Sequence, residues 1–127
     1  MQSPAERRDL RRVIVGPDHS ISFVLRGHPY REVRISNLSA GGCFALVAHR
    51  DARLFERGAI LERLVLLHPE LPKEPMIATV AYVLGTRPGT PLMEFVGVGI
   101  QFLSVEPGPR AALEAWIDAA IAAEQQT

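Results

Sequence analysis

Residues 20–36 read SISFVLRGHPYREVRIS, two runs of alternating apolar and polar residues separated by Gly-His-Pro. A period of two is typical of a strand with one face buried, and Gly and Pro between such runs indicate a turn. The side chains that this alternation places on the inner face are Ile21, Phe23 and Leu25 in the first run, and Val33 and Ile35 in the second. We therefore expect two strands joined by a turn.

The same period continues through most of the chain. It predicts strands over 43–48, with the alternation carried by Phe44 and Leu46, and over 95–103, with residues 51–58 in a loop. Residues 60–68 fit either a strand or a short helix, and their length and the following Pro69 favour a strand. Residues 76–84 are apolar and β-branched, which also indicates a strand. In the last strand the inner face is Val96, Val98, Ile100 and Phe102. The opposite face carries Gly97 and Gly99, which would let another backbone come close.

The period changes after Pro107 and Pro109. Apolar residues then recur at helical spacing, at Leu113, Trp116, Ile117, Ala120 and Ile121. Pro near the first turn and this spacing predict an amphipathic helix over 108–124. Short strands followed by one helix favour an all-β fold, mainly antiparallel, that is either a barrel or a sandwich capped by the helix.

Composition excludes several classes of protein. The chain has 127 residues and is 47% hydrophobic, so one compact domain over 1–127 is expected and a disordered or coiled-coil chain is not. Lys and Arg number 14, as do Asp and Glu, which leaves no overall field to attract DNA or RNA. The single Cys43 allows no intrachain disulfide and is expected to be buried. No signal peptide or membrane span is seen, and we expect a cytoplasmic protein.

No pattern in the sequence points to catalysis. His19, His28, His49 and His68 stand alone in predicted turns or at strand ends, without the spacing of a metal-binding pair or a recognisable carboxylate partner. Ser39 is not in a nucleophile motif, and no paired carboxylates have acid–base spacing. We expect no catalytic residue, no metal ligand and no cofactor.

Two other features stand out. The segment ERRDLRR, residues 6–12, places Arg7, Arg8, Arg11 and Arg12 before the first strand. Residues 37–42, NLSAGG, lie between two predicted strands. Arg binds phosphate bidentately and stacks on flat rings, Asn and Ser offer donors and acceptors, and Gly permits positive φ and a close backbone approach. Read separately, the arginine segment is typical of a solvated basic arm, and residues 37–42 are typical of a hairpin turn.

Taken together, in this order and about 25 residues apart, they resemble the PilZ domain signature. The family pattern is R-x-x-x-R before the first strand and D/N-x-S-x-x-G between later strands, here Arg8 to Arg12 and Asn37 to Gly42. The closing segment GVGIQFLSVEPGPRAALEAWI also resembles the end of the family's barrel and its helix, so the resemblance covers essentially the whole chain.

The resemblance implies a six-stranded PilZ-type β-barrel over 13–104, preceded by a flexible basic arm over 1–12, that binds the bacterial second messenger cyclic di-GMP. On the family pattern Arg8 and Arg12 clamp guanine edges and phosphates, and guanine O6 and N7 do match an Arg fork. Asn37 and Ser39 would bond a guanine edge, while Gly41 and Gly42 complete the motif and Gly42 keeps the backbone clear of the ligand.

Two points of the carry-over stay open. Arg7 and Arg11 form a second R-x-x-x-R frame, although the apolar Val13 directly after Arg12 favours the Arg8/Arg12 frame. Asn37 stands where the family more often has Asp, which replaces a charge with an amide donor.

The resemblance further implies a non-enzymatic adaptor that relays the nucleotide signal to an unidentified downstream effector protein. The alternative is a PilZ-like interaction module of pilus or flagellar machinery that binds no nucleotide. A nucleotide-hydrolysing enzyme is the third possibility and has no metal-ligand cluster or nucleophile in the sequence to support it.

Overall fold

The computed structural model describes residues 11–84 and 95–125. Its long strands are β2 (Ser20–Leu25), β3 (His28–Ser39), β4 (Gly42–Ala48), β5 (Ile60–Leu67), β6 (Met76–Leu84) and β7 (Phe95–Ser104). The remaining elements are the two-residue β1 (Val13–Ile14), the 3-10 helix η1 (His49–Leu54) and the helix α2 (Pro107–Gln125).

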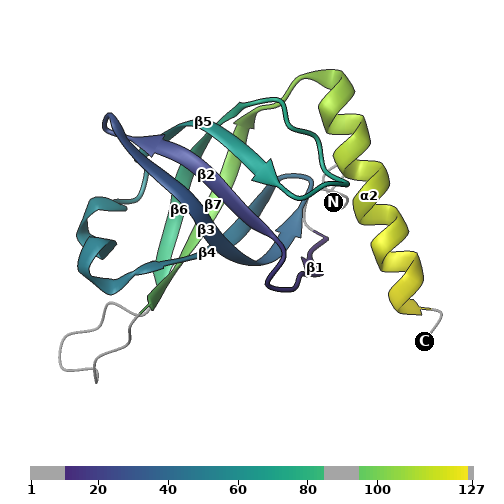
Figure 1. The fold of residues 1–127 in the computed structure, drawn as a ribbon, viewed down its shortest axis with the longest axis horizontal. Coiled ribbons are helices and arrows are strands. Elements are labelled where there is room, and N and C mark those ends of the chain that lie inside the picture. Colours follow the sequence, from purple (N-terminus) through teal and green to yellow (C-terminus); the bar gives the residue numbers. More distant parts are fainter. Residues whose placement is uncertain (1–10, 85–94, 126–127) are drawn as a thin grey trace, which may run out of the picture.

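The six long strands close into an antiparallel barrel (Figure 1). Their order is β3-β2-β5-β6-β7-β4, and a further β3–β4 pairing joins the two ends of the sheet. The short β1 pairs with the C-terminal end of β3, where Ile14 lies opposite Asn37. The register slips within β2–β3, β2–β5 and β6–β7, and such irregularities bend strands enough to let a small sheet curl. The predicted barrel with a C-terminal helix is confirmed.

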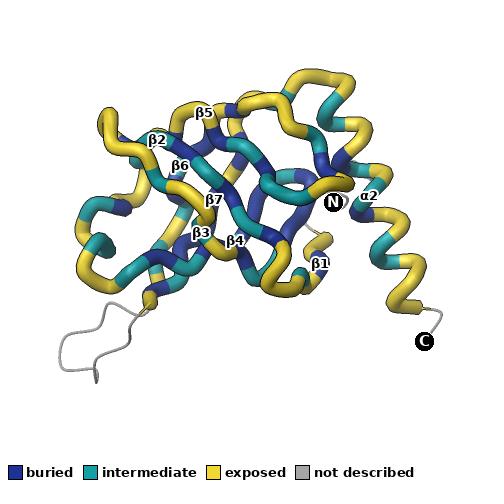
Figure 2. The backbone as a smooth tube through the Cα atoms, viewed as in Figure 1, coloured by how far each residue is buried: buried dark blue, intermediate teal, exposed yellow. Residues whose placement is uncertain are grey.

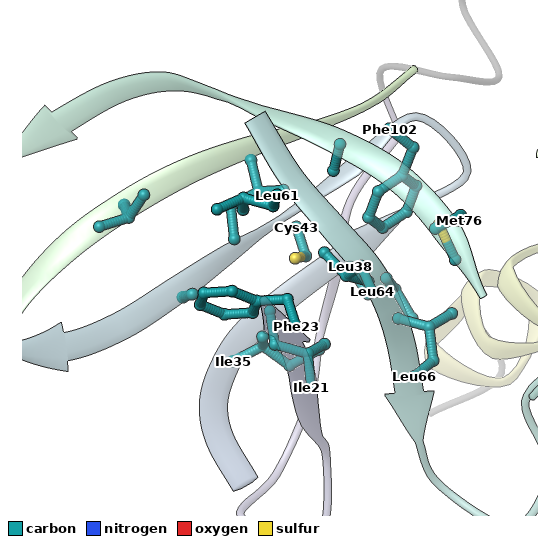
Figure 3. Close-up of a cluster of buried hydrophobic side chains, with 14 of the residues drawn as sticks. Ile21, Phe23, Ile35, Leu38, Cys43, Leu61, Leu64, Leu66, Met76 and Phe102 are labelled. Carbon is teal, nitrogen blue, oxygen red and sulfur yellow. The ribbon is translucent and has the colours of Figure 1, made fainter. Parts of the chain in front are cut away.

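The barrel interior is filled by the alternating apolar faces (Figures 2 and 3). The predicted inner faces of β2 and β7 are buried throughout, and Ile35 of β3 is buried while Val33 is partly so. Cys43 is fully buried, as expected, and lies among the labelled core side chains of Figure 3. Burial, partly offset by the nearby Arg12, raises the pKa of its thiol to about 12.

Some predictions from the alternation were wrong. In β4 the buried residues are Cys43, Ala45 and Val47, so Phe44 and Leu46 face outward. The expected break over 37–42 is only a two-residue turn, because β3 continues to Ser39 and β4 starts at Gly42. Neither glycine of the motif has positive φ. The loop over 51–58 contains part of η1.

Gly97 and Gly99 make room for aromatic rings rather than for a backbone. A Cβ at Gly97 would overlap the ring of Phe44, and one at Gly99 would overlap the ring of Tyr82. These two rings therefore lie over β7, with centroids 6.2 Å apart.

Helix α2 packs against one end of the barrel, and η1 lies at the other (Figure 1). The helix buries Leu113 and Ile117 in the common core, with Trp116 partly buried beside them. The helix thus caps the barrel, as the helical spacing predicted. Within the described residues, no helix combines the length and apolar character needed to cross a membrane.

Candidate functional site

The two sequence motifs meet in space. Arg12 lies just before β1 and Asn37 lies on β3, and β1 pairs with this part of β3. Arg12 Nη1 donates a hydrogen bond to Asn37 Oδ1 at 2.6 Å, across 25 residues of sequence. Arg12 is exposed, so the remaining donors of its guanidinium face solvent or a ligand.

A hollow of about 290 Å³ opens beside this contact. Its lining joins both motifs to β6, β7 and the start of α2, and comprises Arg12, Ser39, Gly41, Ala81, Tyr82, Gly99, Ile100, Gln101, Phe102 and Arg110. A guanidinium, a strand turn and an aromatic ring around one concavity form a surface suited to a flat, anionic ligand.

The Ser39 hydroxyl is used within the motif. It donates to the carbonyl of Gly42 at 3.2 Å and accepts from the backbone N–H of Gly41 at 3.3 Å, and the residue is buried. The Gly41 carbonyl in turn accepts from Phe102 N–H at 2.8 Å. Ser39 therefore shapes the turn between β3 and β4 and fixes its position against β7.

Gly42 has a packing role against β7 that the sequence analysis did not predict. A Cβ at this position would overlap the carbonyl oxygen of Ile100 on β7. Because Gly42 lies opposite Gln101 in the β4–β7 ladder, its missing side chain allows the motif and β7 to approach closely. That Gly42 also keeps the backbone clear of a ligand stays a prediction.

The two arginine frames are treated differently by the fold. Arg11 Nη2 is 2.5 Å from Asp118 Oδ1 on α2, an ion pair whose side chains are 43% and 48% exposed. Arg12, one residue later, faces Asn37 and the hollow. Arg7 and Arg8, and the arm up to residue 10, lie outside the described residues. The last two residues of the predicted arm, at least, are held against the barrel and the helix.

Three lining residues were missed by the sequence analysis. Tyr82 of β6 contributes its ring, which lies over Gly99, and is 41% exposed. Gln101 of β7 and Arg110 of α2 contribute polar groups, and Arg110 Nε also donates to Glu114 at 3.2 Å. The outward position of Gln101 could have been read from the alternation in 95–103. Nothing local shows that β6 and α2 border the motif, since this depends on barrel closure.

A larger hollow of about 860 Å³ lies beside η1. It is lined by His49, Arg50, Ala52, Arg53, Phe55, Glu56, Arg57, Tyr82 and Val83. It contains no residue of either motif, so we place the candidate site at the smaller hollow, where the motifs converge.

The expectation that the four histidines stand alone was wrong for two of them. The rings of His19 and His68 stack with centroids 4.0 Å apart, and Asp18 lies beside both. His28 and His49 are exposed, as expected.

A closed six-stranded barrel whose arginine-bearing N-terminal segment meets an N-x-S-x-x-G turn defines a class of small domains. The PilZ domain family model matches residues 5–119, and this chain belongs to that family. Comparison with curated protein sequences found no match.

Solved structures share the fold. MrkH of K. pneumonia in its apo state superimposes with a TM-score of 0.75 at 17% identity, covering 91% of this chain and 50% of that one. The PilZ domain of YcgR from Escherichia coli, with c-di-GMP, gives a TM-score of 0.70 at 16% identity over 94% of this chain and 95% of that domain. YcgR in complex with c-di-GMP gives 0.69 at 18% identity, covering 94% of this chain and 48% of that one. The chain thus spans about half the length of MrkH.

Proposed function

We propose that this PilZ domain binds cyclic di-GMP at the hollow between the arginine segment and the Asn37–Gly42 turn. The observation that carries the proposal is the contact of Arg12 with Asn37, since it brings together the two halves of the family motif. Structures of the YcgR PilZ domain and of MrkH, which share this fold, contain c-di-GMP, and this supports the choice of ligand.

The chemistry of the lining fits a cyclic dinucleotide. Guanine O6 and N7 form an acceptor pair that an Arg fork reaches bidentately, and the same group binds phosphate. Arg12 takes this role in our proposal, with Arg8, four residues earlier in the motif, as its partner. The Arg11–Asp118 ion pair supports this frame, because it occupies Arg11 on the helix side.

The remaining lining residues supply the other contacts that a guanine needs. The exposed ring of Tyr82 offers a stacking face, and Gln101 and Arg110 offer donors at the border of the hollow. Asn37 already accepts from Arg12, so its amide NH2 stays available for a guanine acceptor. Ser39 holds the turn in shape and is part of the lining of the hollow.

In this proposal the domain is a non-enzymatic adaptor. Binding draws the N-terminal segment onto the barrel, and this change is what a partner protein senses. Ordering of a segment on binding is a common switch, because the free energy of ligand contact is coupled to a change of surface.

Calorimetric titration of the whole chain with cyclic di-GMP tests the proposal, with GTP as the control nucleotide. Saturable binding of the cyclic dinucleotide, with GTP much weaker, is the expected result. Absence of heat at millimolar cyclic di-GMP, from a protein shown to be folded by circular dichroism, would favour the interaction module that binds no nucleotide.

A further inference from the structure

Asp18, His19 and His68 form a compact cluster away from the nucleotide hollow. One donor atom from each residue lies within 4.8 Å of the other two. His68 Nε2 is 3.2 Å from Asp18 Oδ2, and His19 Nε2 is 3.9 Å from Asp18 Oδ1. Asp18 and His19 directly precede β2, and His68 directly follows β5, the strand that pairs with β2. The cluster is therefore held by the barrel framework.

The two imidazoles have an unusual environment. Their rings are parallel within 6° and both contact Trp116 of α2, at centroid distances of 5.4 and 6.2 Å. His19 is 6% exposed, and neither of its ring nitrogens makes a hydrogen bond within the described residues. Its Nδ1 is buried without a partner, and its Nε2 lies 3.9 Å from Asp18 Oδ1, beyond hydrogen-bond distance. A ring nitrogen that makes no hydrogen bond keeps its lone pair available, and coordination of an ion through Nε2, the nitrogen that faces Asp18, is one use for it.

We propose that Asp18, His19 and His68 bind a divalent transition-metal ion of the zinc type. Two imidazoles and a carboxylate form a donor set that suits Zn²⁺, with metal–donor distances of about 2.0–2.2 Å. The side chain of Asp18 is 69% exposed, so it can move the short distance needed to close the three donors around an ion. Water or the nearby Glu70 carboxylate completes the coordination.

Binding requires a rearrangement of the histidine pair. An imidazole coordinates in its own ring plane, and the two rings are now stacked within 6° of parallel, so the His68 ring must turn until its Nε2 points at the shared ion. Its Nδ1 now accepts from the backbone N–H of Glu70 at 3.2 Å, which leaves the ring proton on Nε2, facing Asp18. Coordination through Nε2 moves this proton to Nδ1 and opens the contact with the Glu70 amide, which lies in the connection between β5 and β6.

The position of the cluster indicates what the metal would do. Trp116 Nε1 donates to Glu70 Oε2 at 2.9 Å, so the histidines, the β5–β6 connection and α2 meet at one point. A metal there ties the end of the barrel to the face of α2 that carries Trp116. None of the three proposed metal-binding residues lines the hollow proposed for cyclic di-GMP, so the metal proposal does not depend on nucleotide binding.

Trp116 is the single tryptophan of the chain and reports on the cluster directly. The untagged full chain is titrated with Co²⁺, a paramagnetic substitute for Zn²⁺ that quenches nearby tryptophan fluorescence. Zn²⁺ added afterwards is expected to restore the fluorescence, because it binds such sites more tightly and does not quench. Zn²⁺ is also expected to raise the melting temperature, since it binds the folded state.

The matched variants are His68→Ala and the exposed control His49→Ala, which removes the same side chain from η1. His68→Ala is expected to weaken Co²⁺ binding by about tenfold or more, and His49→Ala to leave it unchanged. Asp18→Asn repeats the test without altering the packing of the rings. Circular dichroism and thermal unfolding establish that each variant is folded.

The proposal is overturned if Co²⁺ leaves the fluorescence of the wild-type chain unchanged. It is equally overturned if folded Asp18→Asn and His68→Ala are quenched at the same metal concentration as His49→Ala. A loss of quenching in either folded cluster variant supports it, because both leave Trp116 in place.

Discussion

Replacement of Arg12 by Ala separates ligand binding from folding. The side chain is exposed and makes one hydrogen bond, to Asn37 Oδ1 at 2.6 Å, while the β1–β3 pairing beneath it is made by backbone groups. We therefore expect the free energy of unfolding to change by no more than about 0.5 kcal/mol. In the proposed complex with cyclic di-GMP, the contact between Arg12 and the ligand is charge-assisted, and its loss should cost roughly 1.5–3 kcal/mol of binding free energy. The affinity for cyclic di-GMP should fall by roughly ten- to a hundredfold.

Two further variants test the physical reason. Arg12→Lys retains the charge but lacks the planar fork, so its affinity should be close to that of Arg12→Ala. Arg11→Ala removes the neighbouring arginine, whose ion pair with Asp118 is solvent-exposed. Surface pairs of this kind contribute about 0–1 kcal/mol to stability, and we expect nucleotide affinity to stay close to that of the wild type.

Titration calorimetry at one fixed salt concentration, together with thermal unfolding, measures both quantities for each variant. The reasoning is refuted if Arg12→Ala binds like the wild type while Arg11→Ala loses affinity, because the motif would then use the Arg7/Arg11 frame. If both variants bind normally, neither described arginine clamps the ligand.

Other expected outcomes follow from single residues. Tyr82→Ala should weaken cyclic di-GMP binding by about 1–3 kcal/mol, measured by calorimetry, because a stacking face is lost; unchanged affinity would place the guanine elsewhere. Gly42→Ala should lower the free energy of unfolding by about 1–3 kcal/mol in denaturant titration, because its Cβ would overlap the Ile100 carbonyl. Cys43, whose burial raises its pKa to about 12, should resist iodoacetamide at pH 8 until the protein unfolds; the corresponding contribution to stability is present below pH 9.0 and is lost as the pH rises toward 12. Trp116→Ala should lower the melting temperature, since the partly buried ring packs on the histidine pair and donates to Glu70; a wild-type melting curve would show that α2 is not held at this point.

Much of the fold could be predicted because it depends on local periodicity. Alternation, together with length and β-branched composition for β5 and β6, identified all six long strands, and alternation gave the correct inner faces of β2 and β7. It failed in β4, where the run CFALVA is apolar at every position and both faces satisfy the pattern equally well. There the face was decided by pairing with β7, in which glycines make room for the outward Phe44.

The candidate site was predicted in part. The resemblance to the family pointed to Arg12, Asn37 and Ser39; the structure places Arg12 and Ser39 in the lining of one hollow and Asn37 in contact with Arg12. It could not indicate that Gly42 serves β7, because the Ile100 carbonyl lies on a strand brought close only by folding, whereas the Ser39 hydroxyl bonds backbone groups two and three residues away.

By itself, then, the sequence determined the strands, the helix and the family, since alternation, helical spacing and motif order are properties of neighbouring residues. Only the tertiary structure decided which distant side chains meet. Tyr82 and Arg110 reach the hollow beside Arg12 through closure of the barrel and docking of α2, and Asp18 meets His68 across 50 residues through the β2–β5 pairing. Such contacts arise from the pairing of strands far apart in the chain, which no local spacing encodes.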